Sequence, residues 1–479
     1  MLRTTKLTTL LIVFSCFFMA CENDDEPTDF DAPSITFESD AITQKPGETA
    51  TLKVTFNAPA GIKSLEVSVD GGDKTTVQVT DGSTNQTVDY TFDVPLEKDG
   101  GKSTWGTVYN FAFTATDKQN IAETGTASAT ITATFVPDNP ISVPGTYAFT
   151  RNSETTVSFS GQTDRLNQLS EIKTLMGNAN NGQAVSAQAL LDMYANTGDN
   201  GGGNFSFTST KQLKNKTFAS AVETVEGWLN EMATNSDNPG TASSGTPGLL
   251  TRVGKNKTIL VDANGREYAQ LIEKGLMGSV FLNQVYNTYL TDDRTGNDVQ
   301  NISLRDGKNY TDMEHHWDEA FGYFGVPVDF PTTTTNRFWG NYSNGRDALI
   351  GSNQKLMDAY IAGRTAIVNF DYDEKDAQRD ILYENLELVA AATAIHYINA
   401  TLDNIGSDQG EMHHALSEAW AFIEALRYSP RAKMTQSEID DILNTDIGIN
   451  FYNVTITGLN DAKDAISSKF GLDNVKNDL

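Results

Sequence analysis

After residue 33 the chain begins with short runs in which apolar and polar residues alternate. Such alternation is typical of β-strands that bury one face. Turn signals containing glycine separate the runs at 70–72 and 81–82. The clearest runs are 51–56, 65–69, 109–117 and 127–135. We therefore predict an all-β, immunoglobulin-like sandwich over residues 34–137.

Near residue 140 the apolar positions change to a spacing of three and four, the period of an amphipathic helix. Residues 138–145, with their prolines and glycine, are typical of a linker. We predict that 146–479 is a large all-α helical-bundle domain, following a short extended segment at 147–159. The predicted helices are 162–175, 185–194, 219–233, 267–289, 312–324, 345–367, 375–404, 409–428 and 436–444.

Several ends and faces of these helices can be predicted from local residues. Asp408 is placed to cap the helix that starts at 409, and Ser429-Pro430 should stop it. The acidic run 371–376 lacks the glycine of a calcium-binding EF-hand, so we expect it to cap the next helix. Residues 386–400 are apolar on all sides, which predicts a helix at the centre of the bundle.

The first twenty residues have the layout of a secretory signal peptide. Arg3 and Lys6 give a basic start, and a short apolar run leads to Ala20 and Cys21. Residues 18–21 resemble the lipobox of bacterial lipoproteins, although phenylalanine stands in place of the usual leucine. In that family the leader is removed and the new N-terminal cysteine is acylated. The resemblance implies a signal peptide at 1–20 and lipidation at Cys21.

An acidic cluster follows the cysteine at 22–26. It resembles the surface-export signal of Bacteroidetes lipoproteins, and the alternative is a solvated acidic tether over 21–33. Both interpretations place the protein outside the cytoplasm. We expect it to be attached to the outer membrane by its lipid and exposed at the cell surface.

Composition excludes several classes of partner and site. The formal net charge is −28, and a surface of that sign repels nucleic acid and anionic lipid. Cys16 lies in the expected leader and Cys21 would carry lipid, so no thiol would remain for a disulfide, a zinc site or catalysis.

The chain has five histidines, and four of them form two adjacent pairs. The pairs are His315-His316 and His413-His414. A His-x-x-x-Glu-Ala-aromatic pattern starts at the first histidine of the first pair and at the second histidine of the second pair. The two patterns are 414 − 315 = 99 residues apart. This spacing suggests a duplicated helical unit, and so two related bundles.

Residues four apart share one helix face, so each pattern can direct an imidazole and a carboxylate at one ion. Two facing patterns would provide four ligands, as bundle metalloproteins do. We predict a divalent metal site for iron, zinc or manganese rather than calcium. The predicted ligands are His315, Glu319, His414 and Glu418, with His316, Asp318, His413 and Glu314 as supporting partners. The alternative for each pattern is an ion pair on a solvated face.

The segments 147–152, 158–162 and 312–327 resemble a Bacteroidetes lipoprotein family, domain of unknown function 4856. The layout is also distantly similar to the imelysins, which have two related helical bundles. Imelysins carry a Gly-x-His-x-x-Glu motif tied to iron acquisition. Here Gly410 is one position too far from His413, and no glycine precedes the His-x-x-Glu of 316–319.

Three functions remain open at this point. The first is a cell-surface metal-binding protein, serving in metal acquisition. The second is a metal-dependent peptidase or other hydrolase, although neither His-Glu-x-x-His nor Gly-x-Ser-x-Gly is present. The third is a non-catalytic module that binds a surface protein or glycan.

Overall fold

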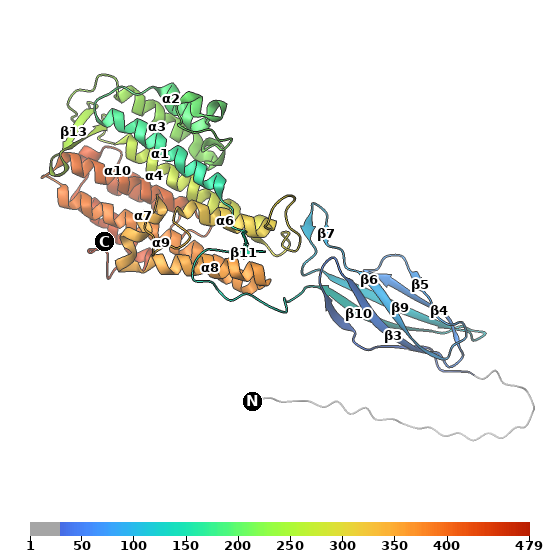
Figure 1. The fold of residues 1–479 in the computed structure, drawn as a ribbon. Coiled ribbons are helices and arrows are strands. Elements are labelled where there is room, and N and C mark those ends of the chain that lie inside the picture. Colours follow the sequence, from blue (N-terminus) through green and yellow to red (C-terminus); the bar gives the residue numbers. More distant parts are fainter. Residues whose placement is uncertain (1–28) are drawn as a thin grey trace, which may run out of the picture. The chain divides into compact units, whose positions relative to one another are not determined.

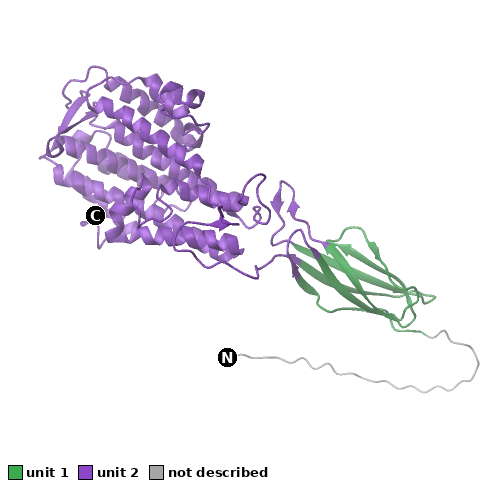
Figure 2. Ribbon diagram, viewed as in Figure 1, with its two compact units in different colours: residues 1–42, 50–92, 108–131 green, residues 43–49, 93–107, 132–479 purple. Residues whose placement is uncertain are grey.

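The computed structural model describes residues 29–479. The predicted signal peptide, Cys21 and the tether up to residue 28 lie outside the described residues. The chain divides into two compact units (Figure 2). Unit 1 comprises residues 1–42, 50–92 and 108–131, and unit 2 comprises residues 43–49, 93–107 and 132–479.

The predicted β-sandwich is confirmed as two sheets, in which the pairs β1–β3, β4–β5 and β4–β9 are antiparallel. One sheet has the order β1-β3-β6 and the other β2-β10-β9-β4-β5. The strands are β1 Ser34–Phe37, β2 Ala41–Gln44, β3 Thr49–Asn57, β4 Ile62–Val69, β5 Thr75–Val77, β6 Asn85–Asp93, β9 Val108–Asp117 and β10 Thr124–Ala133. A short hairpin, β7 Glu97–Lys98 and β8 Lys102–Ser103, belongs to unit 2.

Alternation in these strands sorts the side chains onto two faces. In β3 the apolar Leu52, Val54 and Phe56 are at most 1% exposed, while their neighbours face solvent. In the pairing of β4 with β9, Val67 lies opposite Phe113, so the register keeps apolar residues on the same buried face.

Unit 2 is predominantly helical, as predicted (Figure 1). Its helices are α1 Ser160–Asn180, α2 Ala187–Ala195, α3 Val222–Asn235, α4 Tyr268–Leu276, α5 Asp292–Thr295, α6 Asp312–Phe324, α7 Trp339–Ile350, α8 Ser352–Asn369, α9 Tyr372–Asn404, α10 Gln409–Ala425, α11 Gln436–Asp441 and α12 Ile456–Phe470. Short 3₁₀ segments are η1 Thr197–Asp199, η2 Gly201–Gly203, η3 Lys214–Lys216, η4 Ala219–Ala221, η5 Val253–Lys255, η8 Leu426–Tyr428 and η10 Phe451–Asn453, and π-helical segments are η6 Met277–Leu282, η7 Val285–Tyr289 and η9 Ile442–Ile447.

The predicted helix at the centre of the bundle is confirmed as α9, which packs against α8, α10 and α12. Helices α6 and α10, which carry the two histidine patterns, contribute to one continuous core. The predicted caps are also present. Asp408 accepts a hydrogen bond from the Glu411 amide at 3.0 Å, and Asp371 accepts one from the Glu374 amide at 3.1 Å.

The predicted helix at 345–367 is wrong, because the chain there forms two helices. Gly351 lies between α7 and α8 with φ of +62°, a left-handed conformation that a helix cannot contain. The sequence pattern also missed α12 and the small hairpins β11 Thr150–Arg151 with β12 Glu154–Thr155, and β13 Gly248–Arg252 with β14 Lys257–Val261. Over residues 29–479, no helix combines the length and apolarity needed to span a bilayer.

Candidate functional site

The second histidine pattern lies where α1, α4 and α10 pack side by side, next to the β13–β14 hairpin (Figure 1). Gly410 allows α10 to start directly against this hairpin, since a Cβ there would lie 2.3 Å from the Thr251 carbonyl oxygen. Arg252 of β13 then donates two hydrogen bonds to Glu411, at 2.6 and 3.0 Å. These contacts fix the first turns of the helix, and His414 with them.

His414 is held between two carboxylates. Its Nδ1 lies 2.6 Å from Oε2 of Glu267, and its Nε2 lies 3.5 Å from Oε2 of Glu418. Glu267 is fully buried. Its other oxygen accepts hydrogen bonds from the amides of Asn180 at 3.1 Å and Gln270 at 3.3 Å.

Ion pairs continue from Glu418 through the interior. Glu418 Oε1 lies 3.1 Å from the ammonium of Lys274, which also lies 2.8 Å from Glu273. The second oxygen of Glu273 pairs with Lys173 at 2.8 Å. We call the six residues of this alternating series the charge chain: Lys173, Glu273, Lys274, Glu418, His414 and Glu267.

The electrostatics favour the charged form of His414. Burial disfavours the imidazolium, but the nearby carboxylates of Glu267 and Glu418 outweigh it and raise the pKa of His414 above 6.5. Burial likewise opposes ionisation of Glu267, yet His414 and the amide donors lower its pKa below 4.5. The two shifts therefore both favour an imidazolium paired with a carboxylate.

A polar cleft of about 640 Å³ opens beside this pair. We call it the His414 cleft. The end of α1, the β13–β14 hairpin, α4 and α10 form its walls. Its lining consists of Gly177, Asn180, Asn181, Thr251, Arg252, Asn256, Lys257, Thr258, Ile259, Glu267, Gln270 and His414.

One acceptor in this lining has no partner. Gln270 is 9% exposed, and its Oε1 is buried without a hydrogen bond. The amide cannot turn round, because its NH₂ group donates to the carboxylate of Glu267. A buried carbonyl oxygen without a donor costs about 1–3 kcal/mol. Gln270 therefore brings a buried acceptor without a protein partner to the wall of the cleft.

The first histidine pattern forms a separate pair on α6. His315 Nε2 lies 3.8 Å from Glu319 Oε2, and the imidazole stacks on Tyr310. Glu319 also accepts a hydrogen bond from Gln162 at 3.1 Å. Burial lowers the pKa of His315.

The structure does not bring the four predicted ligands together. Helix α6 packs against α1 and α8, whereas α10 packs against α4 and α9. Among residues 29–479, no ion pair joins the two patterns, and no group of three or more His, Cys, Asp or Glu has the geometry to hold a metal. Each pattern by itself provides two side chains, and Lys274 already neutralises Glu418.

Two of the predicted supporting partners, Glu314 and Asp318, belong to a separate buried network around Arg364. Both pair with Arg364, which is fully buried, at 3.0 and 3.1 Å. Arg151 adds two hydrogen bonds to Glu314, and Tyr147 donates to Asp318 at 2.8 Å. This network joins the extended segment 147–158 to α6 and α8, which is a structural role.

The other two, His316 and His413, have different surroundings. His316 Nδ1 lies 2.8 Å from the Arg294 carbonyl oxygen. His413 is fully buried beside Gly265 and Tyr452, with neither ring nitrogen hydrogen-bonded to a side chain. Burial lowers the pKa of His413 to about 4, so its ring is neutral.

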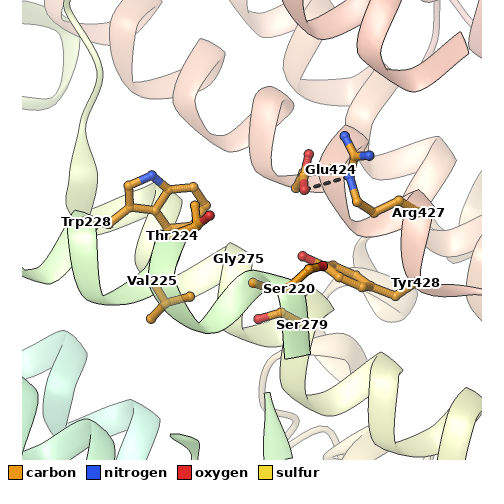
Figure 3. A pocket seen from close by; sticks show the side chains of 10 residues that line it. Ser220, Thr224, Val225, Trp228, Gly275, Ser279, Glu424, Arg427 and Tyr428 are labelled. Atoms are coloured by element: carbon orange, nitrogen blue, oxygen red, sulfur yellow. Dashed lines mark ion pairs between the residues drawn. The ribbon is translucent and has the colours of Figure 1, made fainter. Parts of the chain in front are cut away.

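A second, smaller pocket lies between α3, η6 and the end of α10 (Figure 3). Its volume is about 60 Å³. Trp228 and Thr224 lie on one side, and the ion pair of Glu424 with Arg427 lies on the other (Figure 3). Its size suits a few water molecules.

The sequence interpretation missed Glu267, Gln270, Glu273 and Lys274, all on or next to α4. A signal was present, because positions 267, 270 and the adjacent pair 273–274 recur every three or four residues in an otherwise apolar stretch. Such a polar stripe on a buried helix indicates a buried polar network.

Residues 144–473 match the family described as Domain of unknown function (DUF4856). The chain belongs to this family. The predicted resemblance over the helical region is thereby confirmed at the level of the family.

No curated protein matches the chain. Among solved structures, the sporulation control protein Spo0M from Bacillus subtilis matches with 15% identity and a TM-score of 0.15. The match covers 22% of this chain and 51% of Spo0M, so it spans about half of that protein. A TM-score this low supports no conclusion about fold or function.

Proposed function

We propose that this DUF4856 protein is an exported lipoprotein whose helical unit binds a small polar ligand in the His414 cleft. The observation that carries the proposal is the unpartnered, buried Oε1 of Gln270 in the wall of that cleft. Native proteins leave few buried polar groups without partners, and those that remain are often explained by a ligand or water. The volume of about 640 Å³ lies within the range of small-molecule sites.

The lining indicates the chemistry of the ligand. Gln270 needs a donor, so the ligand carries an N–H or O–H group. The imidazolium of His414 and the ammonium of Lys257 are donors, so the ligand also carries an acceptor oxygen. A glycan hydroxyl pair and the polar end of a peptide both meet this description, in keeping with a non-catalytic surface module.

The proposal includes the membrane anchor. The lipobox-like ending at Cys21 and the acidic cluster after it support lipidation and exposure at the cell surface. A lipid anchor exposed at the cell surface would place the His414 cleft outside the cell, where it can take ligands from the medium.

A screen by thermal unfolding tests ligand binding. The purified protein is heated with neutral sugars, free amino acids or small dicarboxylates, each at about 10 mM. We expect one class to raise Tm in the wild type. Gln270→Leu should abolish that shift, and it costs only about 1 kcal/mol for the lost bond to Glu267.

Gln354→Leu is the matched control, because Gln354 is exposed on α8 and bonds only Asp358. It should keep the shift. The proposal fails if none of the three classes changes Tm, or if Gln270→Leu responds as the wild type does.

Metal binding at His414 is a second candidate, and one observation favours it. A carboxylate at Nδ1 is the arrangement that orients many metal-bound histidines, and it leaves Nε2 directed at Glu418. The ion pair of Lys274 with Glu418 argues against metal binding, because the metal would need the same carboxylate as a ligand. Metal analysis of the protein after exposure to zinc or iron separates the two candidates. One bound ion per chain that is lost in His414→Ala would favour metal binding at His414. A metal-dependent hydrolase would require that result.

A further inference from the structure

Arg337 lies just before α7, half-buried and without an acidic partner. Its Nη1 donates to Asn167 Oδ1 at 2.8 Å, and its Nη2 donates to Ser170 Oγ at 2.9 Å. No carboxylate in residues 29–479 lies within ion-pair distance of it. A guanidinium has five N–H donors, so several remain available. Burial lowers the pKa of Arg337, as expected when no anion compensates the lost solvation.

The backbone holds Arg337 in a fixed position. Its amide donates to the Gly325 carbonyl oxygen at 2.8 Å. The next residue, Phe338, has φ of +48°, a conformation unusual for a residue with a side chain. Its ring is buried against Phe281. Strained residues of this kind cost about 1–3 kcal/mol and occur preferentially at functional sites.

The side chain of Arg337 lines a pocket of about 140 Å³ between α1, α4 and residues 336–341. This is the volume of about four or five water molecules, enough for one small anion. Lys173 adds a second cation, and the side-chain NH₂ groups of Asn336 and Asn341 are further donors in the lining.

Glu273 is the one carboxylate in this lining, and it does not neutralise Arg337. Its two oxygens pair with Lys173 and Lys274, each at 2.8 Å. The lining contains two cations, Lys173 and Arg337, and one carboxylate, Glu273. The pocket is therefore locally cationic in a chain whose net charge is −28.

We propose that the Arg337 pocket is a binding site for a small oxyanion, a carboxylate or a phosphate group. The planar fork of a guanidinium matches both groups. Asn167 and Ser170 each accept one hydrogen bond from it and so hold it in place, and Arg337 lines the pocket with its other N–H donors unpaired in the described residues. The site is separate from the His414 cleft and does not depend on the ligand proposed there.

Calorimetric titration of the full chain with inorganic phosphate, and separately with acetate, tests this site. Sodium chloride at matched ionic strength corrects for screening. We expect saturable binding of at least one of the two anions to the wild type, and the stronger response identifies the group. Arg337→Gln should remove saturable binding, and Arg305→Gln, which removes an exposed charge paired with Asp312, should not.

Arg337→Lys keeps the charge but loses the fork, and it provides a second test if Arg337→Gln does not fold. We expect it to weaken binding by about tenfold, as for loss of a bidentate contact. The proposal is overturned if the wild type shows no saturable binding of either anion. It is also overturned if the folded Gln or Lys variant binds as tightly as the wild type.

Discussion

Glu267 is the residue on which the His414 cleft depends most. It is fully buried, it pairs with His414, and it determines which way the amide of Gln270 faces. The sequence interpretation missed it, because a single glutamate at the start of a helix is usually a solvated or capping group, and the polar stripe that continues from it along α4 was not recognised. His414 and Glu418 could be predicted as neighbours, since a spacing of four places them on one helix face. Their partners could not, because those come from α4, about 150 residues away.

The pair of His414 with Glu267 should make stability depend on pH. The pKa of His414 is raised in the folded state, so its contribution is fully present below about 6.5 and is lost as pH rises through the folded pKa. Glu267 stays ionised throughout this range, because its pKa is lowered. We expect His414→Gln to destabilise the protein by about 3 kcal/mol at pH ~6 and by less at pH ~9. Urea unfolding at the two pH values measures the difference, and a larger loss at the higher pH would contradict it.

Arg364 is the residue on which the second buried network depends. It is fully buried, and it pairs with Glu314 and Asp318 inside the core. We expect Arg364→Met to cost about 3–5 kcal/mol, because the buried Asp318 loses its cation and Glu314 keeps only Arg151. Chemical unfolding measures this loss, and Lys355→Met on the same helix is an exposed control. A change below about 1 kcal/mol for Arg364→Met would show that the network is not a structural one.

At the scale of elements, periodicity predicted most of the helices and strands but not the breaks between them. The bounds of α6 were predicted as observed, since a capping threonine and an ending glycine surround an apolar stripe. The break at Gly351 was missed because a single glycine in a helical pattern does not reveal its φ. The β13–β14 hairpin was missed because its two strands are short, and this hairpin forms one wall of the His414 cleft.

Two glycine substitutions in helices should have opposite effects. Gly345→Ala in α7 meets no atom within 4 Å and should stabilise the protein by about 0.5–1 kcal/mol through helix propensity. Gly410→Ala in α10 would place its Cβ 2.3 Å from the Thr251 carbonyl oxygen and should destabilise it. Thermal unfolding of both variants measures the signs. Stabilisation by Gly410→Ala would mean that α10 does not lie against the hairpin as described.

At the scale of the whole molecule, composition predicted two domains, one β and one α, and the structure confirms that order. The two histidine patterns share one continuous core but not one pocket. A repeat in sequence fixes the spacing within each helix, whereas the neighbours of that helix decide whether two repeats meet. Here α4 is such a neighbour of α10, and its Lys274 pairs with Glu418, the carboxylate that a metal site would need free.

The anchor is a property of the whole chain and can be tested directly. We expect Cys21→Ser to release the protein from the membrane fraction without changing its Tm, because Cys21 would carry the lipid and takes no part in the fold described. Fractionation of cells and labelling with a palmitate analogue measure the effect. Membrane association that persists in the variant would contradict lipidation at this residue.

Titration of the His414 ring by NMR tests the central claim most directly, with His414→Gln used to assign its signal. The account predicts a pKa above 6.5, as expected of an imidazolium held by Glu267, and a signal that equimolar zinc leaves in place. A pKa at or below 6.5, or loss of the signal when zinc is added, would contradict it and favour a metal ligand instead.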